Sequence, residues 1–243
     1  MTAFIDRPPV AFAAATTFWL AVTGSTASPS RGADGEFSTL FPPGGDAYLR
    51  FQRIAGGVGG SHLDLHVDDP AAEADRLGAL GATLVADHGT YFVLRSPGGV
   101  AFCLVGHRGE TVVSPPTTTA DGDRTRVDQL CLDLSPAHFD ADCAFWPAAT
   151  GWELRATRLD EFRFLARPVG APFRLLLQRL GDDAARGHAG AHLDVSCSNA
   201  DRVAAAHQRL GATVVAEHEW WITLTDPAGA PYCLLRRDPV TRR

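Results

Sequence analysis

Hydrophobic and polar residues follow two different periods in the part of the chain that begins at His62. The stretch His62–Asp68 alternates between the two kinds, which is typical of a strand with one buried face. Ala71–Leu80 instead has its apolar residues on one helical face and is followed by Gly81. Three short alternating stretches come next, near Thr83–Ala86, Tyr91–Arg95 and Ala101–Val105. The pattern predicts a strand, a helix and three further strands.

This βαβββ pattern recurs in the second half of the chain without a slip in register. The copy that begins HLDL at His62 is matched by one that begins HLDV at His192. Four pairs of landmarks are each 130 residues apart: His62 and His192, Gly81 and Gly211, His88 and His218, and Cys103 and Cys233. A fixed period of this kind indicates repeated structural units.

A second, weaker repeat lies upstream of each copy. Its landmarks are 127 residues apart: Asp6 and Asp133, Phe18 and Phe145, and Trp19 and Trp146. The first of these segments predicts a strand at Thr2–Asp6, a helix at about Val10–Thr23, and strands near Glu36–Phe41 and Tyr48–Ile54. The chain therefore contains four similar modules.

One such module cannot cover both faces of a small sheet with a single helix, so we expect the modules to pair. The predicted fold class is α+β, with two tandem domains that are each built from two βαβββ modules in a half-open barrel. The boundaries are residues 1–108 and 126–238, and the Pro- and Thr-rich stretch between them, 109–125, is the predicted linker.

Composition excludes several classes of function. The chain of 243 residues has a net charge of −6 and contains no lysine, so neither nucleic-acid binding nor lysine-based catalysis is expected. No apolar run is long enough to span a bilayer, and no signal peptide is recognisable at the N-terminus. The five cysteines are dispersed, which favours reduced thiols and a cytoplasmic location. The expected partner is a small molecule, without membrane or nucleic acid, and a homodimer is left open.

The ordered set of motifs resembles the vicinal oxygen chelate superfamily, and within it the glyoxalase-like domain of the glyoxalase, bleomycin-resistance and extradiol dioxygenase type. The motifs are FWLAVTG and FWPAATG on the first helices, HLDL and HLDV on the strands that follow, GAT after the second helices, and SPGG or DPAG before FCLV or YCLL. The resemblance covers nearly the whole chain and implies a tandem two-domain form.

In that superfamily, metal-dependent members take a histidine from the first strand of each module and a glutamate from the last strand. The resemblance places His62 and His192 at two of the histidine positions, with Phe4 and Cys131 at the other two. Cys103 and Cys233 fall at two of the glutamate positions, and Arg50 and Leu176 near the others. Because the carboxylates are missing, we expect no cofactor, with a divalent metal held by Cys131, His192 and Cys233 as the alternative.

Alternation places His62, Asp64 and His66 on one face of a strand, and His192 and Asp194 repeat the first pair. A functional interpretation makes the two His–Asp pairs catalytic, with each aspartate orienting its histidine. In the structural alternative, His62 and Asp64 form a buried network and His66 is solvated at the strand end.

The other predicted ligand-binding residues divide by chemistry. His88 and His218 each follow an acid near a turn, where we expect either an exposed ion pair or an acid–base group at a cavity mouth. Cys103 and Cys233 are either small buried groups or ligands. Gln52 and Gln178 repeat inside apolar strands, and Arg50 shares a face with Gln52. The predicted aromatic lining comprises Phe4, Phe102, Trp220, Trp221 and Tyr232.

Three functions follow from these residues. The first is metal-independent binding of an aromatic or natural-product ligand in a barrel cavity. The second is an enzyme, a lyase, isomerase or dioxygenase, that uses His/Asp acid–base catalysis or an unusual Cys/His metal site. The third is a scaffold that only dimerises. The sequence leaves open which of the two halves is functional.

Overall fold

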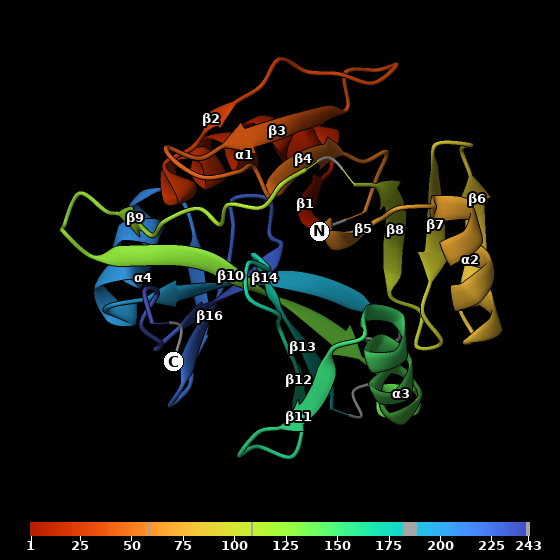
Figure 1. Cartoon of the computed structure of the whole chain (residues 1–243). Helices are drawn as coiled ribbons and strands as arrows, with labels where there is room; N and C mark the ends of the chain where they lie inside the picture. Colours follow the sequence, from red (N-terminus) through yellow and green to blue (C-terminus); the bar gives the residue numbers. More distant parts are fainter. Residues whose placement is uncertain (58, 108, 182–188, 242–243) are drawn as a thin grey trace. The chain divides into compact units, whose positions relative to one another are not determined.

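The computed structural model describes residues 1–57, 59–107, 109–181 and 189–241. The first half contains two modules, each with a helix after its first strand (Figure 1). The elements of the first module are β1 (Thr2–Arg7), α1 (Pro9–Thr23), β2 (Thr26–Ala27), β3 (Phe37–Phe41) and β4 (Leu49–Arg53). Those of the second module are β5 (Gly60–Val67), α2 (Pro70–Ala79), β6 (Thr83–Asp87), β7 (Tyr91–Arg95) and β8 (Ala101–Gly106).

The second half repeats this order after a short strand, β9 (Thr117–Thr118), that lies in the predicted linker. The third module consists of β10 (Arg124–Leu134), α3 (Phe139–Thr150), β11 (Glu153–Ala156), β12 (Phe162–Ala166) and β13 (Arg174–Arg179). The fourth consists of β14 (Gly190–Cys197), α4 (Ala200–Arg209), β15 (Thr213–Glu217), β16 (Trp221–Thr225) and β17 (Pro231–Leu235). The predicted elements are confirmed, and the two-residue strands β2 and β9 were not predicted.

The strands form two mixed sheets with the same topology. One has the order β2-β3-β4-β1-β5-β8-β7-β6 and the other the order β11-β12-β13-β10-β14-β17-β16-β15. The pairs β5/β8 and β14/β17 are parallel, and most other pairs with a defined register are antiparallel. The predicted α+β class with two tandem halves is confirmed.

Local sequence explains where the helices begin and end. Helix α2 begins after Asp69, whose Oδ1 accepts hydrogen bonds from the backbone N–H groups of Ala71 (3.0 Å) and Ala72 (3.1 Å). Helices α1 and α3 end at Gly24 and Gly151, which adopt left-handed φ values of 61° and 70°.

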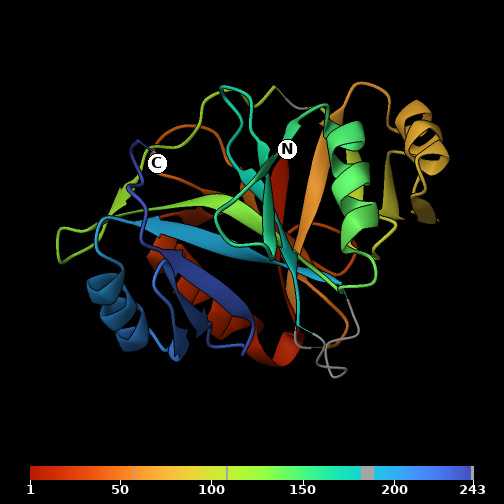
Figure 2. The same ribbon diagram turned by 90° about the horizontal axis from the view of Figure 1, so that it is seen from below.

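Helix α2 packs across β6, β7 and β8, and α4 packs across β15, β16 and β17 (Figure 2). No helix in the described part of the chain has the length and apolar character required to cross a membrane.

Contacts divide the chain into two compact units. Unit 1 comprises Met1–Ala3, His62–Thr111 and Leu130–Ala191, and unit 2 comprises Phe4–Ser61, Val112–Gln129 and His192–Arg243. Unit 1 is thus built mainly from the second and third modules, and unit 2 from the first and fourth. The domain boundaries given above stay a prediction, and the predicted end of the first domain, Arg108, lies outside the described residues.

In unit 2, strand β1 and helix α1 both contact a buried carboxylate of the fourth module. The Trp19 indole Nε1 donates to Asp226 Oδ2 at 2.9 Å, and the Arg7 guanidinium reaches the same carboxylate at 2.6 Å. Phe18 packs edge-on against His207 of α4, whose Nδ1 lies 2.9 Å from the Tyr232 hydroxyl. Burial lowers the pKa of His207 to about 4, so this imidazole is neutral.

In unit 1, helix α3 packs against the second module through a carboxylate that accepts a hydrogen bond from an uncharged serine, Ser96. Ser96 Oγ donates to Asp142 Oδ2 at 2.9 Å, and the Gly98 N–H donates to Asp142 Oδ1 at 2.9 Å. A Cβ on Gly98 would lie 2.6 Å from Asp142 Oδ2, so a larger residue here would displace the Asp142 carboxylate. Phe102 of β8 also packs against Phe145 and Trp146 of α3. Burial raises the pKa of Asp142.

The outermost strands β6 and β15 carry the same irregularity. The pairing of β6 with β7 shifts register between Leu84 and Ala86, and that of β15 with β16 shifts between Val214 and Ala216. The extra residues are Val85 and Val215, which are 52% and 61% exposed. Both strands therefore contain a β-bulge at the equivalent position.

Candidate metal centre

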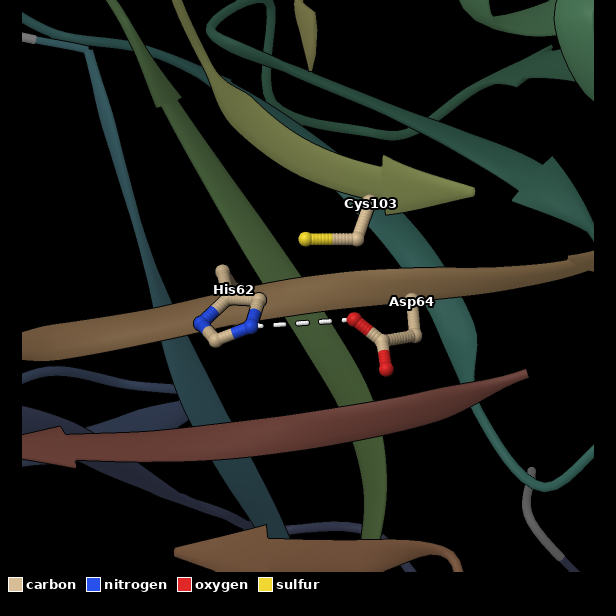
Figure 3. Close-up of side chains that lie close together, drawn as sticks. All are labelled: His62, Asp64 and Cys103. Atoms are coloured by element: carbon tan, nitrogen blue, oxygen red, sulfur yellow. Dashed lines mark ion pairs between the residues drawn. The ribbon is translucent and has the colours of Figure 1, made fainter. Parts of the chain in front are cut away.

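The structure brings together one histidine, one carboxylate and one thiol in unit 1 (Figure 3). His62 and Asp64 point to the same face of β5 because they are two residues apart on a strand. Cys103 belongs to β8, and the parallel register pairs it with Asp64. The three side chains therefore converge because of alternation along one strand and register between two.

The spacing of the three donor atoms fits a bound cation. The ligand atoms of His62, Asp64 and Cys103 all lie within 4.8 Å of one another, and His62 Nε2 is 3.6 Å from Asp64 Oδ1. That separation is too long for a good hydrogen bond. Two ligands bound at about 2.1 Å in tetrahedral geometry are about 3.4 Å apart, which is close to the observed distance. The residues present thus fit a divalent metal ion.

Burial governs the protonation of the thiol. The pKa of Cys103 is raised, chiefly because burial disfavours the thiolate, while the neighbouring His62 acts in the opposite direction. The metal-free thiol is therefore neutral and a poor nucleophile. A cation held by these residues would favour the thiolate form of Cys103, because metal ions deprotonate the thiols that coordinate them.

The equivalent residues of unit 2 form a more enclosed copy. His192 Nε2 lies 3.4 Å from Asp194 Oδ1 and 3.7 Å from Cys233 Sγ. The side-chain amide of Gln129 donates to the other oxygen of Asp194. The His192 side chain is 9% exposed, against 15% for His62. Burial raises the pKa of the Cys233 thiol.

The orientation of the imidazole argues against a Cys–His–Asp nucleophile. In a catalytic triad the two ring nitrogens of the histidine face different partners. In unit 2 the same atom, Nε2 of His192, faces both Cys233 and Asp194. Donors that converge on one point are arranged for chelation rather than for proton relay.

His66, the third predicted residue of the β5 face, has partners of its own. Its Nε2 lies 3.3 Å from Thr2 Oγ1, and its Nδ1 lies 3.4 Å from Glu110 Oε2. The side chain is 2% exposed, so the expectation of a solvated histidine is wrong. In unit 2 the same position is Ser196, which donates to Asp128 at 2.7 Å.

The repeated histidines near the turns stack on aromatic rings. His88 stacks on Tyr91 with ring centroids 4.4 Å apart, and His218 stacks on Trp221 at 4.3 Å. Trp220 is 48% exposed and follows an exposed His218. A role for these residues in ligand binding stays a prediction.

Several other predicted residues have local partners. Arg50 is buried on β4 with its guanidinium 5.9 Å from the centre of the Phe4 ring. Gln178 accepts a hydrogen bond from the Cys131 thiol at 3.4 Å, within unit 1. The metal set of Cys131, His192 and Cys233 that the sequence suggests as an alternative stays a prediction.

Phe102 and Tyr232 have packing roles. Both are fully buried, in the aromatic clusters that join α3 to β8 in unit 1 and α1 to β17 in unit 2. Alternation along β8 sends Phe102 to the face opposite Cys103. The two rings therefore stabilise the contacts between modules.

Sequence reasoning did not identify Glu110 and Gln129 as partners of candidate site residues. Glu110 lies in the predicted linker and Gln129 on a strand whose repeat is weak, and neither residue has an acidic or amide counterpart at the repeat spacing. Only the spatial contacts with His66 and Asp194 identify them.

Two solved structures share the fold of this chain. A Mn(II)-bound glyoxalase from Novosphingobium aromaticivorans is 16% identical, with a TM-score of 0.61 over 96% of this chain and 80% of that one. A 2,2',3-trihydroxybiphenyl 1,2-dioxygenase from Sphingomonas wittichii is 14% identical, with a TM-score of 0.58 over 96% of this chain and 88% of that one. These similarities show the fold.

The chain spans 48% of the length of a xylose isomerase-like TIM barrel/4-hydroxyphenylpyruvate dioxygenase fusion protein, to which it is 12% identical over 96% of its own length, with a TM-score of 0.61. A search of curated protein sequences gives no match. The family model for the glyoxalase-like domain matches residues 3–105 and again 129–235. The chain therefore belongs to the glyoxalase-like domain family, in a tandem form.

The expectation that the protein lacks a cofactor is wrong. It rested on the absence of glutamate at the superfamily's ligand positions, but Asp64 supplies a carboxylate from the histidine's own strand. A metal is also present in the glyoxalase with the same fold. The first half thus combines nitrogen, oxygen and sulfur donors in one place.

Proposed function

We propose that the protein is a metal-dependent enzyme of the vicinal oxygen chelate superfamily, a lyase, isomerase or dioxygenase, that acts on a small molecule at His62, Asp64 and Cys103. The observation that carries the proposal is the convergence of three ligand atoms within 4.8 Å on two paired strands. This reading replaces metal-independent binding, because a site built only for apolar ligands has no need of a chelating cluster.

His62 and Asp64 hold and orient the ion in this proposal, and Cys103 supplies the third protein donor. When bound, the metal polarises a substrate oxygen as a Lewis acid. Three protein donors leave coordination positions for substrate, which is the arrangement of catalytic rather than structural sites.

The cluster of unit 1 suits this role better than its copy in unit 2. The His62 and Asp64 side chains are 15% and 6% exposed, against 9% and 2% for His192 and Asp194. In addition, one oxygen of Asp194 is engaged by Gln129. Access for a substrate therefore favours the first half.

The test combines metal analysis with two probe reactions. Purified protein is supplied with Mn(II), Fe(II) or Zn(II) and offered catechol with oxygen, or the hemithioacetal formed from methylglyoxal and a thiol. We expect turnover of one probe, with loss of bound metal and at least a roughly 100-fold loss of rate in His62→Ala. The matched variant His192→Ala should retain both. Full activity in His62→Ala would overturn the proposal.

A further inference from the structure

Cys103 gives the candidate centre a chemistry that differs from an all-oxygen or mixed oxygen–nitrogen site. Its place on β8 is fixed by the parallel register, which sets it opposite Asp64. The same register sets Cys233 opposite Asp194 in unit 2. A cysteine in this position is therefore repeated, and in unit 1 its sulfur is one of three converging donors.

Donor type decides which ions such a site prefers. Carboxylate, carbonyl and water oxygens suit magnesium, calcium and manganese, whereas thiolates select zinc and other thiophilic ions. Zinc accepts sulfur at about 2.3 Å and nitrogen or oxygen at about 2.0–2.2 Å in tetrahedral sites. One sulfur, one nitrogen and one oxygen within 4.8 Å match that geometry.

The same donor set argues against chemistry with molecular oxygen. Non-haem iron sites that activate oxygen use two histidines and one carboxylate. Among the described residues, the cluster in unit 1 contains one histidine, and the next histidine on that face, His66, is held by Thr2 and Glu110. A thiolate beside such a centre is also a target for oxidation to sulfenic and sulfinic acids.

We infer that His62, Asp64 and Cys103 form a thiolate site that selects zinc over manganese, and that the enzyme is a lyase or isomerase rather than a ring-cleaving dioxygenase. This inference rests on the proposed function and narrows it. In a tetrahedral zinc site, three protein donors would leave one position for a ligand, and the partly exposed His62 gives the cluster some access to solvent. Zinc has no redox chemistry of its own, so the site acts by polarising a bound oxygen.

Cobalt substitution tests the thiolate directly and independently of activity. Metal-free protein is reloaded with Co(II), and its near-ultraviolet spectrum is recorded for thiolate-to-cobalt charge transfer. We expect the band in the wild type and in Cys233→Ser, and its loss in Cys103→Ser. Competition between equal concentrations of Zn(II) and Mn(II), followed by elemental analysis, should give zinc in the wild type. Cys103→Glu, which replaces sulfur by oxygen, should shift the preference toward manganese, with a loss of zinc affinity of more than about 100-fold.

The outcomes separate the inference from the proposed function. Binding of manganese in preference to zinc, without a charge-transfer band, would overturn the inference and leave a metal-dependent enzyme standing. A band that survives in Cys103→Ser and disappears in Cys233→Ser would assign the thiolate to unit 2 and overturn the inference. Failure of the wild type to bind any of the three ions would overturn both. Circular dichroism of each variant checks that the fold is kept.

Discussion

Units 1 and 2 contain two versions of the same contact between a helix and a turn, and they satisfy it with different charges. In unit 2 the turn residue is Asp226, whose carboxylate meets Arg7 and Trp19. In unit 1 the equivalent turn residue is Ser96, and the carboxylate has moved to the helix, as Asp142. Both units thus place a hydrogen-bonded carboxylate between the helix and the turn. The carboxylate comes from the turn in unit 2 and from the helix in unit 1.

Neighbouring positions changed together with the carboxylate. The counterpart of Asp142 on α1 is Ala15, and the counterpart of Gly98 in the other turn is Ala228. Glycine stands where an aspartate approaches, because a Cβ at position 98 would lie 2.6 Å from the Asp142 carboxylate. Similarly, the counterpart of Arg7 is Leu134, a buried apolar residue, so unit 1 has no cation at this position. Each unit therefore carries a self-consistent set of residues.

Asp226→Asn should have the largest effect on this comparison. It removes the charge that pairs with the buried Arg7, and breaking one side of a buried ion pair typically costs about 3–5 kcal/mol. The free energy of unfolding, measured by urea denaturation, should fall by that amount at neutral pH. The matched change in unit 1, Ser96→Ala, should cost about 1 kcal/mol.

A double variant serves as the control for this prediction. In Arg7→Leu/Asp226→Ser, both charges are replaced by the residues found in unit 1, so much of the lost stability should return. If Asp226→Asn is no more destabilising than Ser96→Ala, the ion pair does not distinguish the two units.

A double variant, His207→Leu/Tyr232→Phe, gives unit 2 the residues of unit 1, Leu77 and Phe102. The pKa of His207 is about 4 in the folded protein, below its ordinary value of 6.5, so the unfolded chain binds more protons between these values. Wild-type stability should therefore fall as pH falls from about 6.5 to about 4, by up to about 3 kcal/mol.

The double variant should lack this component of the acid sensitivity. The measurement is the difference in unfolding free energy between variant and wild type at several pH values. A difference that stays constant from neutral to acidic pH would show that His207 does not control the slope.

Asp142→Asn should produce the smallest change, with the opposite sign. Burial raises the pKa of Asp142, so the folded state binds the extra proton and stability falls as pH rises above the ordinary carboxyl pKa of 3.8. Asparagine keeps an acceptor for Gly98 and removes this loss. At neutral pH, thermal unfolding should show the variant as stable as the wild type or more stable by up to about 1 kcal/mol. A clear loss of stability would mean that the ionised carboxylate is needed.

The sequence predicted the fold well because the repeats and the local periods carry it. Strands such as Tyr91–Arg95 follow from alternation alone. The strands β2 and β9 were missed because two residues cannot show a period. The pairing of the first module with the fourth within unit 2 depends on contacts such as Trp19 with Asp226, more than 200 residues apart, which no local pattern reveals.

The candidate site could be predicted in part. Alternation placed His62 and Asp64 on one face, and both appear in the cluster. The expectation of no cofactor failed because it considered each ligand position separately. Whether Asp64 can replace a missing glutamate depends on its register with Cys103, a property of two strands rather than of one.

The bulges at Val85 and Val215 have a consequence for the behaviour of the protein in concentrated solution. They interrupt one edge strand of each sheet at an exposed valine. At these two edges, a strand from another molecule would meet a backbone that is out of register, which disfavours edge-to-edge pairing there. The two halves thus differ in the charges of their contacts between helix and turn and share the bulge on an edge strand.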